Sequence, residues 1–247
     1  MNTGPNQYVE SLAIDEEARQ RSQNSFLQAK SRQQLFLERL LKEDGCDFAE
    51  VGDICCGNGA LSYWLQKEYP RCHFHLFDLN PAMLKDAARI CPGSEFKVSE
   101  GDIYDLKGVA NGAFDLTLCW QTLSWLEHPQ DALRELLRIT KPGGRLYLSS
   151  LFNLHHDVDI YNKVYDWTRE SAKTGHYVCY NVYSMRTVRQ WLEAGTARAQ
   201  VIPFEIDLDL PCNSRGLGTY TAALADGRRL QFSAGMLMNW GVLKIVR

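Results

Sequence analysis

EVGDICCGNGALSYWL, residues 50–65, joins an apolar run to a helical pattern through a turn that holds two glycines and two cysteines. The apolar run predicts a strand that ends near Asp53, and the pattern from Ala60 predicts a helix. Glycines at such a turn let the backbone approach a ligand, because they carry no Cβ atom. The stretch therefore indicates a nucleotide site at the carboxyl edge of a parallel sheet, with a cysteine metal site as the alternative.

Strand and helix patterns alternate from this stretch as far as residue 152. Such alternation predicts parallel strands joined by right-handed helical crossovers. Residues 153–194 are rich in aromatic side chains, and we expect two helices there, the second running from Ser184 to Ala194. After them we expect a strand over 199–210, a hairpin over 219–232 and a final strand over 241–247.

Composition narrows the range of partners. The chain has 247 residues, a formal net charge of -3 and no long basic run, so the electrostatic footprint of a nucleic-acid-binding protein is missing. No apolar stretch approaches the roughly 20 residues that span a bilayer, and the first residues lack the pattern of a signal peptide. We expect a cytoplasmic protein with a small-molecule partner and no nucleic acid or membrane partner; the sequence does not predict an oligomeric state.

The spacing of acidic residues refines the nucleotide hypothesis. Asp78 lies about twenty positions after the glycines, at the end of the second predicted strand, where an acidic residue binds a ribose diol. The third glycine of a dinucleotide motif is missing, because Ser62 stands at its position. An adenosine ligand without a pyrophosphate therefore fits better than a dinucleotide.

Four ordered motifs resemble those of the class I S-adenosylmethionine-dependent methyltransferases: VGDICCGNG, FDLNPAML, SEGDIYDL and the segment from FDLTLCW to YLSS. The resemblance covers about residues 46–152. It implies that S-adenosyl-L-methionine is the cofactor, that Asp53 orients the loop and that Asp78 takes both ribose hydroxyls. The remaining cofactor contacts that it implies are Gly57, Gly59, Leu79, Met83, Asp102, Ile103, Trp120 and Gln121. The family usually has a glycine where this chain has Cys55, so the first turn is expected to differ in shape.

The resemblance also implies the fold and the organisation of the chain. We expect an α/β fold with a Rossmann-like, seven-stranded, mostly parallel sheet and an antiparallel last strand. The segments are a helical cap (1–45), the cofactor-binding core (46–152), a helical and aromatic cap (153–194), and C-terminal strands with a hairpin insertion (195–247). The implied function is in-line methyl transfer to a small acceptor, such as a hydroxyl or amine of a metabolite or sugar-like compound. A nicotinamide-dependent oxidoreductase and a non-catalytic cofactor-binding protein are the alternatives.

The acceptor side has weaker signals. His155 and His156 follow the fifth predicted strand and are the candidate catalytic bases, because an imidazole accepts a proton near neutral pH. The predicted acceptor contacts are Tyr8, Arg21, Trp120, His155 and Tyr177. A metal at His155, Asp157 and Asp159 and a surface loop without a role are the alternatives.

The cysteines do not form a metal-binding pattern. None of the eight belongs to a C-x-x-C pair, and the adjacent Cys55 and Cys56 leave a strand end in different directions. We expect no metal site and interpret most of the cysteines as core thiols.

Overall fold

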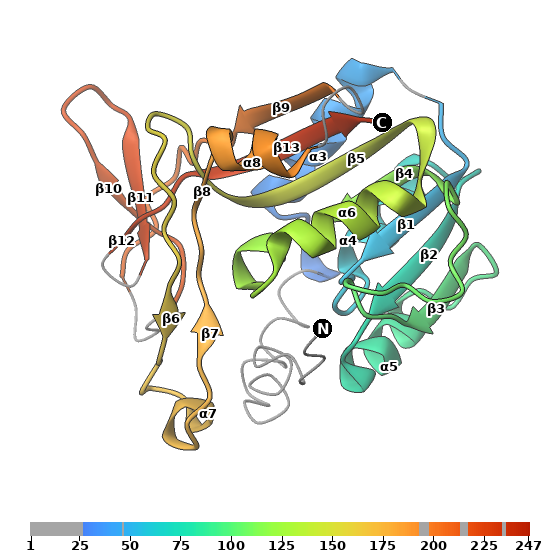
Figure 1. The fold of residues 1–247 in the computed structure, drawn as a ribbon, viewed down its shortest axis with the longest axis horizontal. Coiled ribbons are helices and arrows are strands. Elements are labelled where there is room, and N and C mark those ends of the chain that lie inside the picture. The colour runs from blue at the N-terminus through green and yellow to red at the C-terminus, as the bar shows by residue number, and fades with distance from the viewer. Residues whose placement is uncertain (1–26, 46, 193–197, 213–216, 234–235) are drawn as a thin grey trace.

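A computed structural model describes residues 27–45, 47–192, 198–212, 217–233 and 236–247 of the chain. Its centre is a twisted sheet with helices on both faces (Figure 1). The strands of this sheet in chain order are β1 (Glu50–Ile54), β2 (His73–Asp78), β3 (Phe96–Glu100), β4 (Phe114–Cys119), β5 (Thr140–Asn153), β9 (Arg198–Pro203) and β13 (Trp240–Val246).

The strand order confirms the predicted fold class. The strands lie in the order β3-β2-β1-β4-β5-β13-β9, and β8 (Tyr183–Ser184) pairs with the end of β5. Strands β1 to β5 pair in parallel, whereas the last strand, β13, is antiparallel to both of its neighbours. The strand order reverses at β1, with β2 and β3 on one side of it and β4 and β5 on the other. The loops after β1 and β4 therefore lie side by side, and open α/β sheets bind ligands at such a position.

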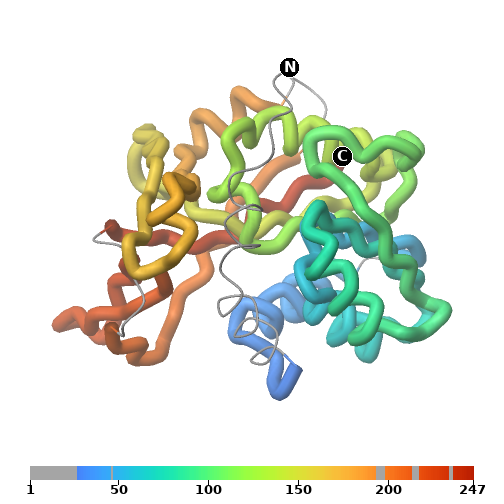
Figure 2. The backbone as a smooth tube through the Cα atoms, turned by 90° about the horizontal axis from the view of Figure 1, so that it is seen from below, coloured from blue at the N-terminus to red at the C-terminus, as the bar shows by residue number. Residues whose placement is uncertain are grey.

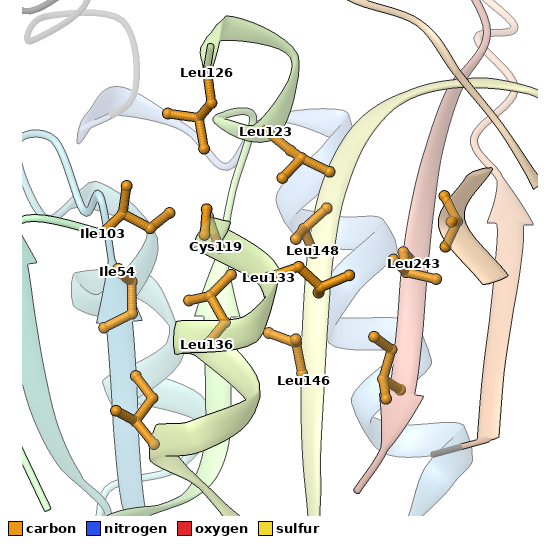
Figure 3. Close-up of a cluster of buried hydrophobic side chains, with 14 of the residues drawn as sticks. Ile54, Ile103, Cys119, Leu123, Leu126, Leu133, Leu136, Leu146, Leu148 and Leu243 are labelled. Carbon is orange, nitrogen blue, oxygen red and sulfur yellow. The ribbon is translucent and has the colours of Figure 1, made fainter. Parts of the chain in front are cut away.

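Helices cover the two faces of the sheet (Figure 1). The helices are α3 (Arg32–Asp44), α4 (Ala60–Glu68), α5 (Pro81–Ile90), α6 (Pro129–Ile139) and α8 (Met185–Trp191). One core cluster combines Leu37 of α3, Leu65 of α4 and Ala87 of α5 with strand residues. A second joins α6 and α8 to the other face, and Figure 3 shows Leu133 and Leu136 of α6 over Leu146 and Leu148 of β5. None of the helices within the described ranges is long and apolar enough to cross a bilayer.

Local sequence explains where several helices begin and end. The Asn80 side chain caps α5 by accepting the Ala82 N–H at 2.9 Å, and Pro81 occupies the first turn, where no N–H is needed. Ser31 and Gln34 form a capping box at the start of α3. The same helix ends at Gly45 as predicted, with the glycine at φ +54°. The remainder of the predicted N-terminal cap, residues 1–26, lies outside the described residues.

The segment after β5 differs from the sequence prediction of two helices. Strands β6 (Lys163–Val164) and β7 (Val178–Cys179) form an antiparallel ribbon. Between β5 and α8, all of which the structure describes, the only helix is the four-residue α7 (Glu170–Lys173). The prediction of a first full helix was therefore wrong, because valines and aromatic residues around both strands favour a ribbon. The second predicted helix is confirmed as α8, with the Ser184 hydroxyl accepting the Thr187 N–H at its start; its predicted end at Ala194 lies outside the described residues.

The C-terminal hairpin forms as predicted and gains one strand. Strands β10 (Tyr220–Ala223) and β11 (Arg229–Ser233) pair antiparallel on either side of Asp226-Gly227, and β12 (Met236–Leu237) adds to β11. A third cluster of buried side chains joins Val178 and Tyr180, from the region of the β6–β7 ribbon, to Phe204 and Trp240. The β6–β7 ribbon and the β10–β12 sheet accordingly lie at the same end of the molecule in both views (Figures 1 and 2).

Candidate active site

A cavity of about 730 Å³ opens at the carboxyl ends of the parallel strands. Its walls include residues that follow β1, β2, β3 and β4, together with residues from the β6–β7 ribbon and the segment after β9. The sequence-predicted cofactor residues that line it are Asp53, Gly57, Asp78, Leu79, Met83, Asp102, Ile103, Trp120 and Gln121. The volume lies within the usual range of small-molecule sites, about 300–1,000 Å³.

The two glycines of the opening stretch have different surroundings. Gly57 has φ +56°, and a Cβ atom built on it would meet no atom within 4 Å. Its backbone can therefore be approached closely by a ligand. Gly59, at φ +77°, is outside the cavity lining, and a Cβ there would lie 3.0 Å from Leu76 Cδ2 and 3.2 Å from Cys91 Sγ. Gly59 thus packs the start of α4 against the core, while its assignment as a cofactor contact stays a prediction.

Two non-glycine residues of the cavity have left-handed backbone conformations. Cys55 follows β1 with φ +60°, and Gln121 follows β4 with φ +55°. This conformation is unfavourable for residues with a Cβ atom and is concentrated at functional sites. The turn after β1 therefore keeps a geometry that suits glycine, although this chain has a cysteine there.

Asp78 is the acidic group at the centre of the loop region. Its Oδ2 accepts the Gly57 N–H at 2.9 Å, and its Oδ1 accepts the Asn80 N–H at 2.9 Å. Burial raises the pKa of the Asp78 carboxyl, and hydrogen bonds from the Asn80, Gly57 and Leu79 N–H groups partly oppose the rise. A carboxylate has about four acceptor positions. Asp78 is thus fixed at the cavity wall and keeps acceptor capacity for a ligand hydroxyl.

Two amide groups at the cavity fit a polar ligand. Asn58 Oδ1 accepts the Ala60 N–H at 3.2 Å, and Asn80 Oδ1 caps α5. The Nδ2 atoms of Asn58 and Asn80 are buried and have no hydrogen-bond partner among the described residues. Buried donors are normally paired, so both point to a ligand that supplies acceptors. Together with the acceptor positions of Asp78, they fit the nucleoside and amino-acid parts of the cofactor that the resemblance implies.

Asp53 is buried at the end of β1 and held by α4. Ser62 donates its hydroxyl to Asp53 Oδ2 at 2.6 Å. Burial raises the pKa of Asp53 to about 6, the Ser62 hydrogen bond lowers it, and the nearby charge of Asp78 raises it. Ser62, which stands where a dinucleotide motif has its third glycine, therefore positions Asp53 just before the loop.

The raised pKa of Asp53 predicts a pH dependence of stability. A carboxyl whose pKa is higher in the folded state contributes stability at low pH and loses it as pH rises through that pKa. We expect the free energy of unfolding of the wild type to fall relative to Asp53→Asn by on the order of 3 kcal/mol between pH 4 and pH 7. Urea unfolding across this pH range measures the difference.

Asp115 is the control for this titration. Its carboxylate pairs with Lys141 at 2.7 Å. Burial raises the pKa of Asp115, but Lys141 and two backbone N–H groups outweigh it, so the net shift is downward. The free energy of unfolding of the wild type should fall relative to Asp115→Asn as pH is lowered, a trend of opposite sign to that for Asp53. A wild type and Asp53→Asn with parallel pH profiles would contradict the assignment of a raised pKa to Asp53.

The cysteines of the opening stretch are protonated thiols at neutral pH. A hydrogen bond with Cys119, followed by burial, raises the pKa of Cys55 well above its usual value, and burial is the main cause of the same effect at Cys56. Metal binding requires thiolates, so neither environment favours a ligand role. The described part of the chain contains no group of three or more His, Cys, Asp or Glu residues that could hold a metal ion.

The predicted acceptor residues are only partly brought together. Trp120 lines the cavity, whereas His155, His156 and Tyr177 do not belong to its walls. His155 and His156 are exposed in the loop after β5, and the Tyr177 hydroxyl donates to Glu127 at 2.6 Å. Tyr8 and Arg21 lie outside the described residues. The roles assigned to these residues stay predictions.

Sequence reasoning did not single out two parts of the cavity wall. One is a polar group on the ribbon: Asp166, Arg169 and His176. The other is the segment from Phe204 to Leu210, which continues past the end of β9. The strand predicted over 199–210 ends at Pro203, so the prediction of its second half was wrong; the alternation of apolar and acidic residues in FEIDLDL instead gives an irregular segment with one apolar face. No comparable pattern marks the ribbon residues.

Comparison with known proteins gives a family match for the core. A family profile described as a methyltransferase domain matches residues 52–148. The malonyl-[acyl-carrier protein] O-methyltransferase of Hahella chejuensis is 31% identical over 111 residues, which are 45% of this chain and 39% of that protein. The demethylmenaquinone methyltransferase of Chlamydia trachomatis is 30% identical over 99 residues, 40% of this chain and 43% of its own. The matches therefore span about two fifths of these relatives.

Solved structures share the fold over most of the chain. A methyltransferase from Aquifex aeolicus that depends on S-adenosylmethionine superposes with a TM-score of 0.55 at 17% identity, over 94% of this chain and 99% of that one. The N-methyltransferase NodS from Bradyrhizobium japonicum was solved with S-adenosylhomocysteine. It superposes with a TM-score of 0.53 at 16% identity, over 98% of this chain and 97% of that one. The [4+2]-cyclase SpnF superposes with a TM-score of 0.61 at 15% identity, over 87% of this chain and 81% of that one. At these identities the likeness concerns the fold alone, and SpnF is a reminder that one fold supports different reactions.

Proposed function

We propose that the chain is a class I S-adenosylmethionine-dependent methyltransferase, which transfers a methyl group from this cofactor to a small-molecule acceptor. The observation that carries the proposal is the Asp78 carboxylate, fixed by the Gly57 and Asn80 N–H groups beside the open backbone of Gly57. The cavity continues beyond these residues to the ribbon and the segment after β9. That continuation leaves room for an acceptor next to the cofactor.

The residues of the chain would act mainly by position. When bound, S-adenosylmethionine supplies a methyl group that is already activated by its positive sulfur. Asp78 would hold the ribose diol, Asn58 and Asn80 would donate to acceptors of the cofactor, and Asp102 with Ile103 would border the adenine. Trp120 and Gln121, after β4, would border the methyl group. Alignment of the acceptor atom with that methyl group and exclusion of water then account for most of the rate increase.

An acceptor that must lose a proton also needs a base, and His176 is an imidazole that lines the cavity. Its Nδ1 lies 3.0 Å from Thr174 Oγ1, and that hydroxyl donates its only proton to the Ser171 carbonyl at 2.9 Å. Because the Thr174 proton is engaged, we assign Nδ1 as the donor of this pair, and the lone pair of the neutral imidazole then lies on Nε2. This arrangement supports His176 as the base in place of the sequence-based candidates His155 and His156, which do not line the cavity.

Three parallel substitutions distinguish these histidines. We expect His176→Ala to lower turnover by about 10²- to 10⁴-fold with an acceptor that must be deprotonated, because general-base catalysis contributes that range. His155→Ala and His156→Ala serve as the matched comparison, with turnover near that of the wild type. Steady-state rates at saturating cofactor measure all three. A loss found only in the His155 or His156 variants would instead support the assignment made from the sequence.

Methyl transfer itself is tested with a labelled cofactor. The protein is incubated with S-adenosylmethionine that carries tritium in its methyl group and with panels of hydroxyl and amine compounds. We expect tritium to appear in an acceptor together with an equal amount of S-adenosylhomocysteine. Binding of S-adenosylhomocysteine without transfer to any compound would favour a non-catalytic cofactor-binding protein.

A further inference from the structure

The segment after β9 presents a continuous apolar stripe to the cavity. Four alternate residues line the cavity, and we call them the apolar stripe: Phe204, Ile206, Leu208 and Leu210. The residues between them are Glu205, Asp207 and Asp209, all exposed and absent from the lining. Successive side chains of an extended chain point to opposite sides, which explains this division. The cavity wall here is therefore hydrocarbon along the whole segment.

Hydrogen bonds hold the stripe in place at both ends. Phe204 N–H donates to the Trp240 carbonyl at 2.8 Å, and the Gln231 side chain donates to the Phe204 carbonyl at 2.9 Å. At the other end, Leu210 N–H donates to Thr221 Oγ1 at 2.7 Å, and Thr221 N–H donates to the Leu210 carbonyl at 2.9 Å. Because its backbone is held by β10, β11 and β13, the stripe is a fixed part of the wall.

Aromatic residues on neighbouring elements extend the apolar surface. Trp125, next to the end of β4, and Tyr180, after β7, both line the cavity, and their ring centroids lie 4.7 Å apart. Trp240 lines it too, and its Nε1–H donates to Thr219 Oγ1 at 3.3 Å, while the Tyr180 hydroxyl donates to Met238 Sδ at 3.3 Å. The polar atoms of Tyr180 and Trp240 are thus engaged with protein groups. The rings offer a ligand mainly carbon surface.

The charged residues of the ribbon wall are paired with each other. Asp166 and Arg169 line the cavity and form an ion pair at 3.2 Å, in which the Asp166 side chain is only 8% exposed. A sugar-like acceptor would need hydrogen-bonding partners along its whole body, because unpaired buried hydroxyl groups are costly. The apolar stripe cannot provide them.

We propose that the half of the cavity formed by the apolar stripe, Trp125, Tyr180 and Trp240 is an acceptor subsite for a compound with a largely hydrocarbon body, such as an aromatic ring or an alkyl chain. This inference rests on the proposed methyl transfer and specifies its substrate class. The body of the acceptor packs on the stripe, and its hydroxyl or amine reaches the methyl group near Trp120 and Gln121. The subsite disfavours sugar-like acceptors, which are one of the acceptor types that the resemblance implies.

The test uses 1-naphthol as the apolar probe and methyl α-glucoside as the polar probe. Both are titrated calorimetrically into the full chain saturated with S-adenosylhomocysteine, so that the cofactor half of the cavity is filled. Leu208→Asn makes the stripe polar, and Leu230→Asn is the matched control. Leu208 and Leu230 are 38% and 40% exposed, but only Leu208 lines the cavity.

We expect 1-naphthol to bind the wild type and Leu230→Asn equally and Leu208→Asn about 10-fold or more weakly, with no binding of the glucoside. Tighter binding of the glucoside than of 1-naphthol would overturn the inference, as would equal 1-naphthol affinities of the two variants. Absence of 1-naphthol binding to the saturated wild type would overturn it as well. The initial titration with S-adenosylhomocysteine is read separately, and its failure would contradict the proposed function instead.

Discussion

Gly57→Val should abolish the binding of S-adenosylhomocysteine while the protein stays folded. The backbone of Gly57 lies open to the cavity at φ +56°, with no atom within 4 Å of a built Cβ. A branched side chain there would fill space that the cofactor needs, so we expect an affinity at least 100-fold lower. The backbone strain of a non-glycine residue, about 1–2 kcal/mol, lowers stability without preventing folding. Calorimetric titration and thermal unfolding measure the two effects.

Gly108→Val is the matched control for this substitution. Gly108 also has a left-handed conformation, with φ +86° and no atom within 4 Å of a built Cβ, but it does not line the cavity. Both variants should lose similar stability, and only Gly57→Val should lose cofactor binding. Equal affinities of the two variants for S-adenosylhomocysteine would contradict the assignment of Gly57 to the cofactor site.

Asp78→Ala should weaken S-adenosylhomocysteine binding by about 1.5 to 3 kcal/mol, which corresponds to roughly 10- to 150-fold. The substitution removes the proposed acceptor of the ribose hydroxyls. It also releases the N–H groups of Gly57 and Asn80, which the carboxylate orients. Calorimetric titration at pH 7.5 measures the change.

Asp115→Ala controls for the structural part of this effect. Asp115 likewise accepts two backbone N–H groups, those of Ala49 and Glu50, but it does not line the cavity. Its loss should reduce stability and leave cofactor affinity within about twofold of the wild type. A folded Asp78→Ala protein with the affinity of Asp115→Ala would refute the ribose assignment.

The proposed cofactor half of the site could be predicted from the sequence because its residues belong to local motifs. Gly57 and Asp78 stand at the ends of successive strands, and parallel pairing brings such ends to one edge of the sheet. The cofactor residues that the resemblance implies therefore line one cavity, with the exception of Gly59. Gly59 differs because its neighbours, among them Leu76 and Cys91, depend on how α4 and α5 pack.

The proposed acceptor half could not be predicted because it is built by tertiary contacts between distant segments. His176 on the ribbon and Leu208 after β9 line the same cavity as Asp78, although they are far apart in the sequence. His155 follows β5 directly and would border the site if the chain stayed at the sheet edge. Instead, the exposed loop leads into the ribbon, and the ribbon returns His176 to the cavity.

The central claim is that this cavity holds S-adenosylmethionine, and a comparison of S-adenosylhomocysteine with NAD in calorimetric titrations of the wild type tests it most directly. The two ligands share an adenosine group, but NAD also has a pyrophosphate. The motif that binds a pyrophosphate needs a third glycine, so that its helix can pack closely against the strand, and this chain lacks that glycine. We predict that S-adenosylhomocysteine binds with one molecule per chain and that NAD gives no detectable heat of binding. Binding of NAD without binding of S-adenosylhomocysteine would contradict the account.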